Sequence, residues 1–493
     1  MSRTRATPTA SPPARRARPL ALAVLAAAAI ALIVQRVWLA AAEPLWFDEA
    51  WGLAVARAPD WGSVVHEARV DTNAPLYELL LHAWTAVAGA SDLALRLPGL
   101  IAVAAAAAWP LARRAPGLTF DGRLAFAAVI FAWWGIDIFL AGRPYGLLLA
   151  LSVAQCLAFA ELIRKPATRT ALAWATLGSL AILTHYYAAI VTAVQGLAFL
   201  ALHRGMALRT WPAALAFAPA AAWVAWHAPR LAAFAATDVA WHARLDPVDA
   251  LAMAAFTLNP SAPALGLLTA VAAGVAFLLA RRRTDSETRP LWTVVAASLA
   301  GLVLTLASGM LHPSLTARYL IPTAPGLILG LVLMAQGSAR PRLAMSALVG
   351  VYLVTALWPG AVSDGLKRGS PYGFETASDL LMRHGVSDVV FAWDHEVTPL
   401  MPPDTLGRVG GVFFRRSGSI ARIHPLVVHP SDDVNALALA AATGPRPGII
   451  WIYNRAGRTS AAARPPRIAQ IDPRWTCQRM GDETVGSLAC WRR

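Results

Sequence analysis

The stretch Leu45-Trp46-Phe47-Asp48-Glu49-Ala50-Trp51 sets two adjacent carboxylates between aromatic residues, directly after the first long apolar run of the chain. That run, residues 20–40, is long enough to cross a bilayer as a helix. It is longer than a signal-peptide core and no convincing cleavage site follows it, so we expect an uncleaved first span. Residues 1–18 are basic and lack apolar periodicity, so we expect a disordered cytoplasmic tail. Asp48 and Glu49 then lie on the outer face.

Apolar residues also dominate the rest of the chain. Of its 493 residues, 57% are hydrophobic and 14% are charged, whereas about 25% are charged in a soluble domain. The composition therefore predicts a mostly α, polytopic membrane protein. The apolar runs predict eleven transmembrane helices, at residues 20–40, 96–112, 123–141, 145–163, 170–187, 188–202, 210–227, 262–280, 291–310, 319–336 and 342–359.

Positive charge alternates between the loops that join these runs. Every second loop is basic, as is typical of the cytoplasmic side of a membrane protein. This pattern accounts for much of the net charge of +15, so we expect no nucleic-acid partner. We expect a multi-pass protein of the inner or plasma membrane, with its N-terminus in the cytoplasm. The basic loops contain Arg113 and Arg114; Arg164, Lys165 and Arg169; His203, Arg204 and Arg209; residues 281–283; and Arg340 and Arg342.

The remaining segments of the chain lie outside the membrane by this topology. In the first outer loop, residues 42–95, the amphipathic stretches 50–67 and 76–88 predict helices lying in the membrane interface. After the transmembrane domain, residues 19–360, the composition changes. Residues 361–493 predict an extracytoplasmic α/β domain with strands at 388–393, 411–414 and 448–453. Cys477 and Cys490 can pair if this domain faces an oxidising compartment, a point that the sequence leaves open.

Asp48 and Glu49 are the candidate catalytic residues. Acidic residues at the outer end of a span are commonly solvated and without function, which is the alternative interpretation. Aromatic neighbours hold these two at the membrane surface, where a carboxylate is partly desolvated and becomes more basic. A lipid-linked phosphate would reach the same depth. We therefore interpret Asp48 as a general base.

Two outer arginines are the candidate phosphate ligands. Arg143 lies in Gly142-Arg143-Pro144-Tyr145, and Arg318 lies in Ala317-Arg318-Tyr319. Each could instead anchor a helix end by snorkelling to the interface. Positive charge is otherwise scarce in the outer loops, so we favour binding of a lipid phosphate that departs as a leaving group.

Histidine and cysteine residues give weaker indications. His185-Tyr186-Tyr187 lines a sugar pocket or belongs to the aromatic belt of the membrane interface. No pair of His or Cys residues has the spacing of metal ligands, and no nucleophile motif with a nearby base is present in the sequence. We expect no cofactor; a divalent metal held by carboxylates is not predicted. Arg96-Leu97-Pro98 opens a span, and we expect it to be structural.

Six short motifs resemble one family in their order and placement. They are Trp46-Phe-Asp48-Glu49, Asn73-Ala-Pro75-Leu-Tyr77, Arg96-Leu-Pro98, Arg143-Pro-Tyr145, Thr184-His-Tyr-Tyr187 and Arg318-Tyr-Leu-Ile-Pro322. Together they resemble the bacterial polyprenyl-phosphate-sugar glycosyltransferases of the GT-C class, over residues 20 to about 340. More narrowly, they resemble the branch related to the protein O-mannosyltransferases (glycosyltransferase family 39-like) and the lipid A aminoarabinose transferases.

The resemblance implies an inverting, metal-independent transfer of a sugar from a polyprenyl monophosphate carrier to a lipid, glycan or protein acceptor. It implies that Asp48 is the base and Glu49 supports it. The family usually has two prolines before Leu-Tyr; here Ala74 replaces the first, and Asn73 stands where His or Lys is often found. Arg143 and Arg318 are therefore the expected donor-phosphate ligands. The expected substrate-pocket residues are Asn73, Tyr77, Tyr145, His185, Tyr186 and Tyr319.

Two other classes of function remain open at the level of sequence. A flippase or other transporter of lipid-linked sugars should carry ionisable or helix-breaking residues near mid-membrane on several spans. Apart from Asp137, this chain has few of them. A non-catalytic membrane protein that binds an envelope polymer through residues 361–493 would lose its function on deletion of that domain and would tolerate substitution of Asp48.

Overall fold

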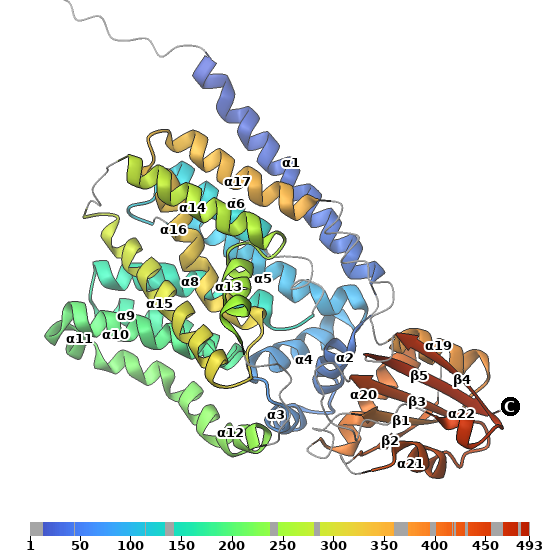
Figure 1. Cartoon of the computed structure of the whole chain (residues 1–493). Coiled ribbons are helices and arrows are strands. Elements are labelled where there is room, and N and C mark those ends of the chain that lie inside the picture. The colour runs from blue at the N-terminus through green and yellow to red at the C-terminus, as the bar shows by residue number, and fades with distance from the viewer. Residues whose placement is uncertain are drawn as a thin grey trace, which may run out of the picture.

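The computed structural model has a helical body followed by a smaller domain built on a β-sheet (Figure 1). It describes residues 13–43, 45–113, 115–133, 142–236, 245–280, 286–358, 373–394, 401–416, 418, 421–428, 432–454, 467–481 and 485–492. The first helix, α1, begins at Pro13, inside the stretch that we expected to be a disordered tail; residues 1–12 lie outside the described part.

Each predicted span contains at least part of a helix, although residues 134–141, with Asp137, lie outside the described part. The helices of the body are α1 (Pro13–Ala42), α5 (Asp92–Ala112), α6 (Phe120–Trp133), α8 (Tyr145–Arg164), α9 (Thr168–Thr184), α10 (Ala188–His203), α11 (Gly205–Arg209), α12 (Ala218–Ala236), α13 (Pro247–Leu258), α14 (Pro263–Leu279), α15 (Arg289–Leu311), α16 (Ala324–Gly337) and α17 (Pro341–Leu357). Two 3₁₀ segments, η1 (Trp211–Phe217) and η2 (Ala317–Thr323), precede α12 and α16.

Among the described residues, five helical segments are long and apolar enough to cross a membrane. These are Leu22–Ala42, Asp92–Ala112, Tyr145–Arg164, Arg289–Leu311 and Ala317–Gly337. Helices α13 and α14 meet at a bend of 75° and make a sixth if they form one span. Helices α10 and α17 are apolar but shorter. The chain is therefore a mostly helical multi-pass membrane protein, and the count of eleven spans stays a prediction.

Small residues allow the helices of the body to approach one another closely. Gly146 of α8 lies against Gly99 of α5, where a Cβ on Gly146 would come within 2.7 Å of the Gly99 backbone. Gly301 of α15 lies against Val191 of α10, where a Cβ would meet that side chain at 2.8 Å. Membrane helices associate through such close packing because lipid tails offer no hydrophobic gain.

The first outer loop contains three helices, α2 (Phe47–Ala56), α3 (Trp61–Val70) and α4 (Leu76–Ala88). The helix predicted over 76–88 agrees with α4. The prediction of one helix over 50–67 is wrong, because this stretch is divided between α2 and α3. It is interrupted because Pro59 disfavours helical geometry at the residue before it. Asp60 then starts α3 as its N-cap, with its carboxylate accepting a hydrogen bond from the Ser63 backbone N–H at 2.8 Å.

The C-terminal domain is α/β, as expected. Its five-stranded sheet has the order β2-β1-β3-β5-β4, parallel among β2, β1 and β3 and antiparallel among β3, β5 and β4. The disulfide Cys477–Cys490 joins directly opposite residues of β4 and β5. The elements are α19 (Phe374–Arg383), β1 (Asp388–Asp394), α20 (Pro403–Arg416), β2 (Arg422–Leu426), α21 (Val434–Ala441), β3 (Pro447–Asn454), α22 (Ile468–Ile471), β4 (Trp475–Gly481) and β5 (Val485–Arg492).

The strand expected at 411–414 is wrong, because these residues lie in α20. Leu406, Val409 and Phe413 recur at helical spacing and are buried together in the domain core. A short apolar run can belong to a strand or a buried helix, and only the residues before it distinguish the two.

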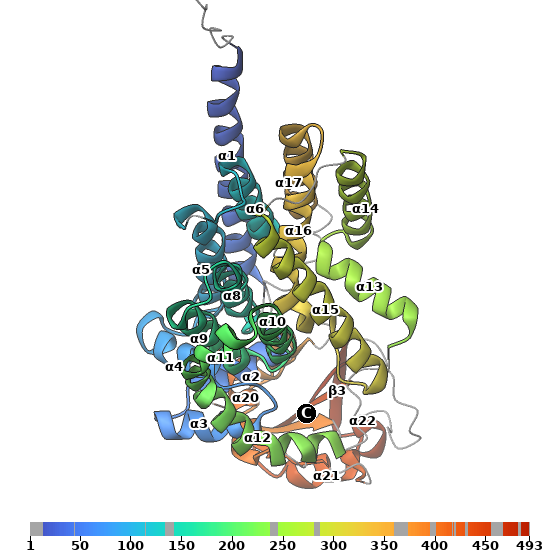
Figure 2. The same cartoon turned by 90° about the vertical axis from the view of Figure 1, so that its left-hand side faces the viewer.

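The C-terminal domain packs on the first outer loop, mainly on α2 (Figures 1 and 2). The ring of Phe47 lies 4.7 Å from that of Trp393 and 5.8 Å from that of Phe374, between centroids. Glu67 of α3 accepts hydrogen bonds from Thr405 and Arg408 of α20. The helix that carries Asp48 is therefore part of the core shared with the C-terminal domain.

Candidate active site

Asp48 and Glu49 lie in the first turn of α2, where carboxylates interact favourably with the helix dipole. Trp46 is the N-cap residue, and its backbone N–H donates to Glu49 Oε2 at 3.2 Å. Asp48 is half-buried, whereas Glu49 is 2% exposed. The two neighbouring carboxylates therefore have different surroundings.

Glu49 forms a fully buried ion pair with Arg96 of α5. Arg96 Nε donates to Glu49 Oε1 at 2.7 Å, and Nη2 donates to Oε2 at 2.6 Å. The remaining amino group, Nη1, donates to the backbone carbonyls of Ala40 at 3.0 Å and Glu43 at 2.8 Å. One guanidinium thus ties together the end of α1, the start of α2 and α5.

Arg143 lies beside Asp48, just before α8. Its Nη1 donates to the backbone carbonyl of Asp48 at 3.4 Å. The preceding residue, Gly142, has φ +51°, and a Cβ there would collide with the Glu49 carboxylate. Its carbonyl accepts a hydrogen bond from Tyr77 Oη at 3.0 Å. A glycine at this position therefore permits the close approach of the Arg143 loop to α2.

Carboxylates surround Arg143. Burial alone lowers the pKa of its guanidinium, but the charges of Asp48, Asp71 and Glu78 outweigh this effect, together with Tyr145, and the pKa is raised. Glu78, in the first turn of α4, is 3% exposed. Burial raises its pKa to about 7, against the opposing effect of Arg143 and with a contribution from Asp71. Arg143 is therefore a permanent cation beside a carboxyl that titrates near neutral pH.

Arg318 has a different environment, between two aromatic faces. Its Cζ lies 5.4 Å from the ring centroid of Trp46 and 5.3 Å from that of Tyr145. Aromatic faces attract a guanidinium without neutralising it. Within the described part of the chain, no hydrogen bond or ion pair engages this guanidinium. It can therefore accept an anion without breaking an existing pair.

His185 lies close to both arginines, at the end of α9. Its ring centroid is 4.5 Å from that of Tyr319 and 6.1 Å from that of Tyr145. The charges of Arg143 and Arg318 both act on its imidazole. Its Nδ1 is buried and has no hydrogen-bond partner among the described residues.

Asn73 and Tyr186 belong to a second group of contacts, which fixes the loop before α4. The Asn73 side-chain amide donates to Asp71 Oδ2 at 2.7 Å, and the backbone carbonyl of Asn73 accepts from Tyr186 Oη at 3.4 Å. Tyr186 Oη also lies 2.6 Å from His227 Nδ1 and accepts from Trp223 Nε1 at 2.8 Å, both on α12. These two residues therefore position the loop that carries Asp71.

The structure thus brings together Asp48, Arg143, Arg318, Tyr145, His185 and Tyr319, from elements that are far apart in sequence. Tyr77 supports the Arg143 loop, and Glu49 pairs with Arg96. Sequence reasoning missed Glu78 and Asp71. Glu78 could have been found from the sequence, because it is an acidic residue in a mostly apolar helix. Among the described residues, no three His, Cys, Asp or Glu side chains are grouped to hold a metal ion.

A scan of the sequence against models of protein families finds no match, and a search of curated proteins finds none either. The fold, however, matches two crystal structures of ArnT from Cupriavidus metallidurans. The apo structure matches with a TM-score of 0.58 at 12% identity, over 96% of this chain and 98% of ArnT. The structure of ArnT bound to undecaprenyl phosphate matches with a TM-score of 0.55 at 12% identity, over 95% and 97%. The chain therefore has the fold of ArnT over nearly its whole length, which confirms at the level of fold its resemblance to the GT-C polyprenyl-phosphate-sugar glycosyltransferases.

Proposed function

We propose that this protein is an inverting glycosyltransferase that moves a sugar from a polyprenyl monophosphate carrier to an acceptor on the outer face of the cytoplasmic membrane. The observation that carries the proposal is the grouping of Asp48, Arg143 and Arg318. Arg143 donates to the Asp48 backbone and is acted on by the Asp48 charge, and Arg318 lies over Trp46 and Tyr145 beside them. One acid beside two cations suits a reaction that takes a proton from one substrate and leaves a phosphate on the other. The ArnT structure with undecaprenyl phosphate supports a carrier of this kind.

Asp48 is the proposed base. It takes the proton of an acceptor hydroxyl or amine while that group attacks the anomeric carbon. The bond from the anomeric carbon to the phosphate oxygen breaks as the new bond forms on the opposite face, so the configuration inverts. Glu49 is a positioning residue in this proposal, because both of its oxygens are engaged by Arg96.

Arg318 is the proposed main ligand of the departing phosphate. Its guanidinium is stacked on Trp46 and Tyr145 and has no carboxylate partner within the described chain, so its charge is available. Arg143 is partly compensated by Asp48, Asp71 and Glu78, and contributes less. A phosphate monoester is a fair leaving group, so alignment and charge stabilisation suffice for the transfer.

Two observations support the proposed side of the membrane. The basic loops alternate in phase with the predicted spans, which favours a cytoplasmic N-terminus and an outer C-terminal domain. The disulfide Cys477–Cys490 supports an oxidising surrounding for that domain. Asp48 and the C-terminal domain then lie on the same, outer side, since the two are in contact through Phe47.

The proposal is tested by transfer of label from a panel of radiolabelled polyprenyl-phosphate sugars to membrane extract, catalysed by purified protein in vesicles. We expect Asp48→Asn to lower the rate by at least about 100-fold, the usual contribution of a general base. Asp249→Asn is the matched control, because Asp249 also lies in the first turn of a helix but is exposed and is not one of the residues of the cluster. Full activity of Asp48→Asn, with unchanged thermal stability, would refute the assignment of the base.

The alternatives predict different results in the same vesicles. A transporter would move the labelled carrier across the membrane with no label reaching an acceptor. A protein that only binds an envelope polymer would show neither transfer nor movement, and would be insensitive to Asp48→Asn. Label transfer that depends on Asp48 therefore separates the three functions.

A further inference from the structure

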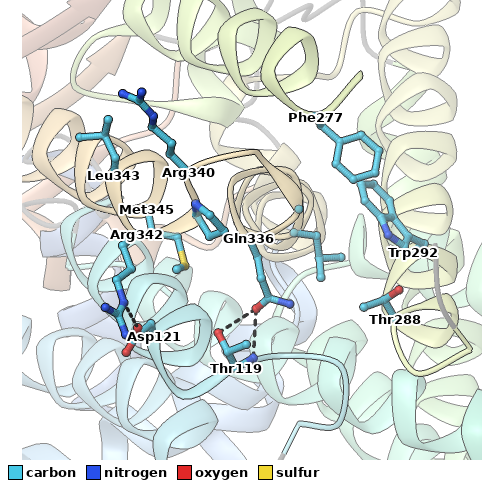
Figure 3. Close-up of a pocket in the computed structure, with 13 residues that line it drawn as sticks. Thr119, Asp121, Phe277, Thr288, Trp292, Gln336, Arg340, Arg342, Leu343 and Met345 are labelled. Carbon is cyan, nitrogen blue, oxygen red and sulfur yellow. Dashed lines mark hydrogen bonds and ion pairs between the residues drawn. The ribbon is translucent and has the colours of Figure 1, made fainter. Parts of the chain in front are cut away.

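A cavity of 680 Å³ lies in the helical body, away from the cluster around Asp48 (Figure 3). It is bounded by the start of α6, the end of α14, the start of α15, the end of α16 and the start of α17. Residues that line it include Phe277, Trp292, Leu333, Gln336, Arg340 and Arg342. None of these residues takes part in the contacts of the candidate active site.

The position of the cavity along the helices puts it near the opposite membrane boundary. Arg318 lies in η2, which leads directly into α16, and the cavity lies at the far end of α16. Seven 3₁₀ residues and fourteen α-helical residues extend over about 35 Å, slightly more than the roughly 30 Å thickness of the hydrocarbon core. Both α14 and α17 lie at the end of the body far from the C-terminal domain (Figures 1 and 2).

The polar side of the cavity carries a cation that has no partner among the described residues. Arg340 is exposed, and its guanidinium has no hydrogen bond or ion pair within the described part of the chain. Arg342 Nε lies 3.7 Å from Asp121 Oδ2, a loose pair with the arginine side chain 81% exposed. Of the described residues that line the cavity, Asp121 is the single acidic one. These residues therefore give the mouth a net positive charge.

Gln336 shapes the cavity, and most of the hydrogen-bonding capacity of its amide is already used. Its Oε1 accepts from the backbone N–H and the hydroxyl of Thr119, both at 3.0 Å (Figure 3), and its Nε2 donates to the Gly117 carbonyl at 2.8 Å. These bonds hold the end of α16 to the segment before α6. The cationic groups available to a ligand are the guanidinium groups at the mouth.

The other side of the cavity is apolar and continues onto the lipid-facing surface. Phe277 and Trp292 lie opposite the arginines, with their ring centroids 5.4 Å apart (Figure 3). Next to them, Leu278 and Leu279 are 73% and 77% exposed, and Leu343 on the arginine side is 60% exposed. In a membrane such side chains contact acyl chains. A ligand here can keep an anionic group at the arginines and an apolar chain in the bilayer.

We propose that this cavity is a binding site for an anionic phospholipid, with the phosphate at Arg340 and Arg342 and the start of an acyl chain against Phe277 and Trp292. Paired cationic side chains at the cytoplasmic boundary attract anionic lipids, and a guanidinium binds a phosphate through two parallel hydrogen bonds. The continuity with exposed leucines favours a membrane lipid over a soluble anion. This site is separate from the proposed transferase reaction and does not depend on it.

The test is native mass spectrometry of the full-length protein, released from detergent after titration with phosphatidylglycerol. We compare the unchanged protein with Arg340→Gln and with Arg340→Gln/Arg342→Gln. Both arginines are exposed, so these variants are expected to fold. Arg209→Gln is the matched control, because Arg209 is exposed in another predicted cytoplasmic loop and does not line the cavity. Phosphatidylethanolamine, undecaprenyl phosphate and inorganic phosphate are titrated in parallel.

We expect the double substitution to weaken binding of one phosphatidylglycerol molecule at least tenfold, roughly the loss of one charge-assisted hydrogen bond. The control should bind it as the unchanged protein does, and phosphatidylethanolamine should bind weakly to all. Equal binding of phosphatidylglycerol to all variants would overturn the proposal. Dependence on Arg340 for undecaprenyl phosphate alone would also overturn it, in favour of a carrier site, and displacement of the lipid by inorganic phosphate would indicate a simple anion patch.

Discussion

Glu78 offers a test of the electrostatics of the candidate site that does not need a known substrate. The carboxyl is 3% exposed, and its Oε2 has no hydrogen-bond partner among the described residues. Arg143 stabilises the ionised form, but burial outweighs it and raises the pKa to about 7. The substitution Glu78→Gln keeps the shape and the neutral state of the side chain. It therefore removes the titration and little else.

The sign of the effect follows from the proton balance. The folded protein holds the Glu78 proton more tightly than the unfolded chain does, so stability is highest below pH 4.5 and falls as the pH rises to about 7. Raising the pKa from 4.5 to about 7 corresponds to about 3 kcal/mol at alkaline pH. Glu78→Gln should therefore match the unchanged protein at pH 5 and exceed its stability at pH 8.5.

The assay is the apparent Tm in detergent at pH 5 and pH 8.5, measured for both proteins. The unfolding entropy of a chain of this length is about 1 kcal/mol/K, so 3 kcal/mol corresponds to a rise of about 3 °C for Glu78→Gln at pH 8.5 alone. Other groups titrate equally in both proteins, so the difference between them isolates Glu78. Glu287→Gln, at an exposed carboxyl, should give a difference that does not change with pH. A pH-independent difference for Glu78→Gln, or a loss of stability at pH 8.5, would refute the buried-carboxyl argument.

Two further predictions concern the residues on either side of the Asp48 carboxylate. Arg318→Gln should lower kcat/KM for label transfer by about 10²–10³, the effect of losing one group that stabilises the leaving charge. Arg318→Lys keeps the charge and should lose less, and equal losses in the two variants would contradict a role for the positive charge. Glu49→Gln should destabilise the fold by about 3–5 kcal/mol, since it removes the carboxylate that pairs with the buried guanidinium of Arg96. An unchanged apparent Tm would contradict this prediction.

The helices of the body were predictable because apolar runs of this length form helices in a bilayer. Their ends were less predictable where a proline lies close to them. The run 319–336 begins with the 3₁₀ segment η2, which contains Pro322, and the run 210–227 begins with η1, which contains Pro212. A proline cannot donate a backbone hydrogen bond, so the chain turns more tightly there. The motif around Arg318 consequently lies on η2 and not on a continuous α-helix.

The residues of the candidate site were easier to predict than the ion pairs and hydrogen bonds between them. The motifs pointed to Asp48, Arg143 and Arg318, which lie close together in the structure. The ion-pair partner of Glu49 was not predictable. Arg96 was interpreted as a residue that opens a helix, and 47 positions separate it from Glu49. Ion pairs between distant segments depend on tertiary packing, which a single sequence does not encode locally.

Phe47, Asp48 and Glu49 together explain how one turn of helix can hold a base in place. Successive residues of an α-helix point about 100° apart, so these three side chains face three different surroundings. Phe47 packs on Trp393 and Phe374 of the C-terminal domain, and Glu49 pairs with Arg96 of the membrane body. Asp48 lies between these two anchored residues, and its charge acts on Arg143. The C-terminal domain therefore supports the site by fixing α2, although none of its described residues is among the residues of the charged cluster.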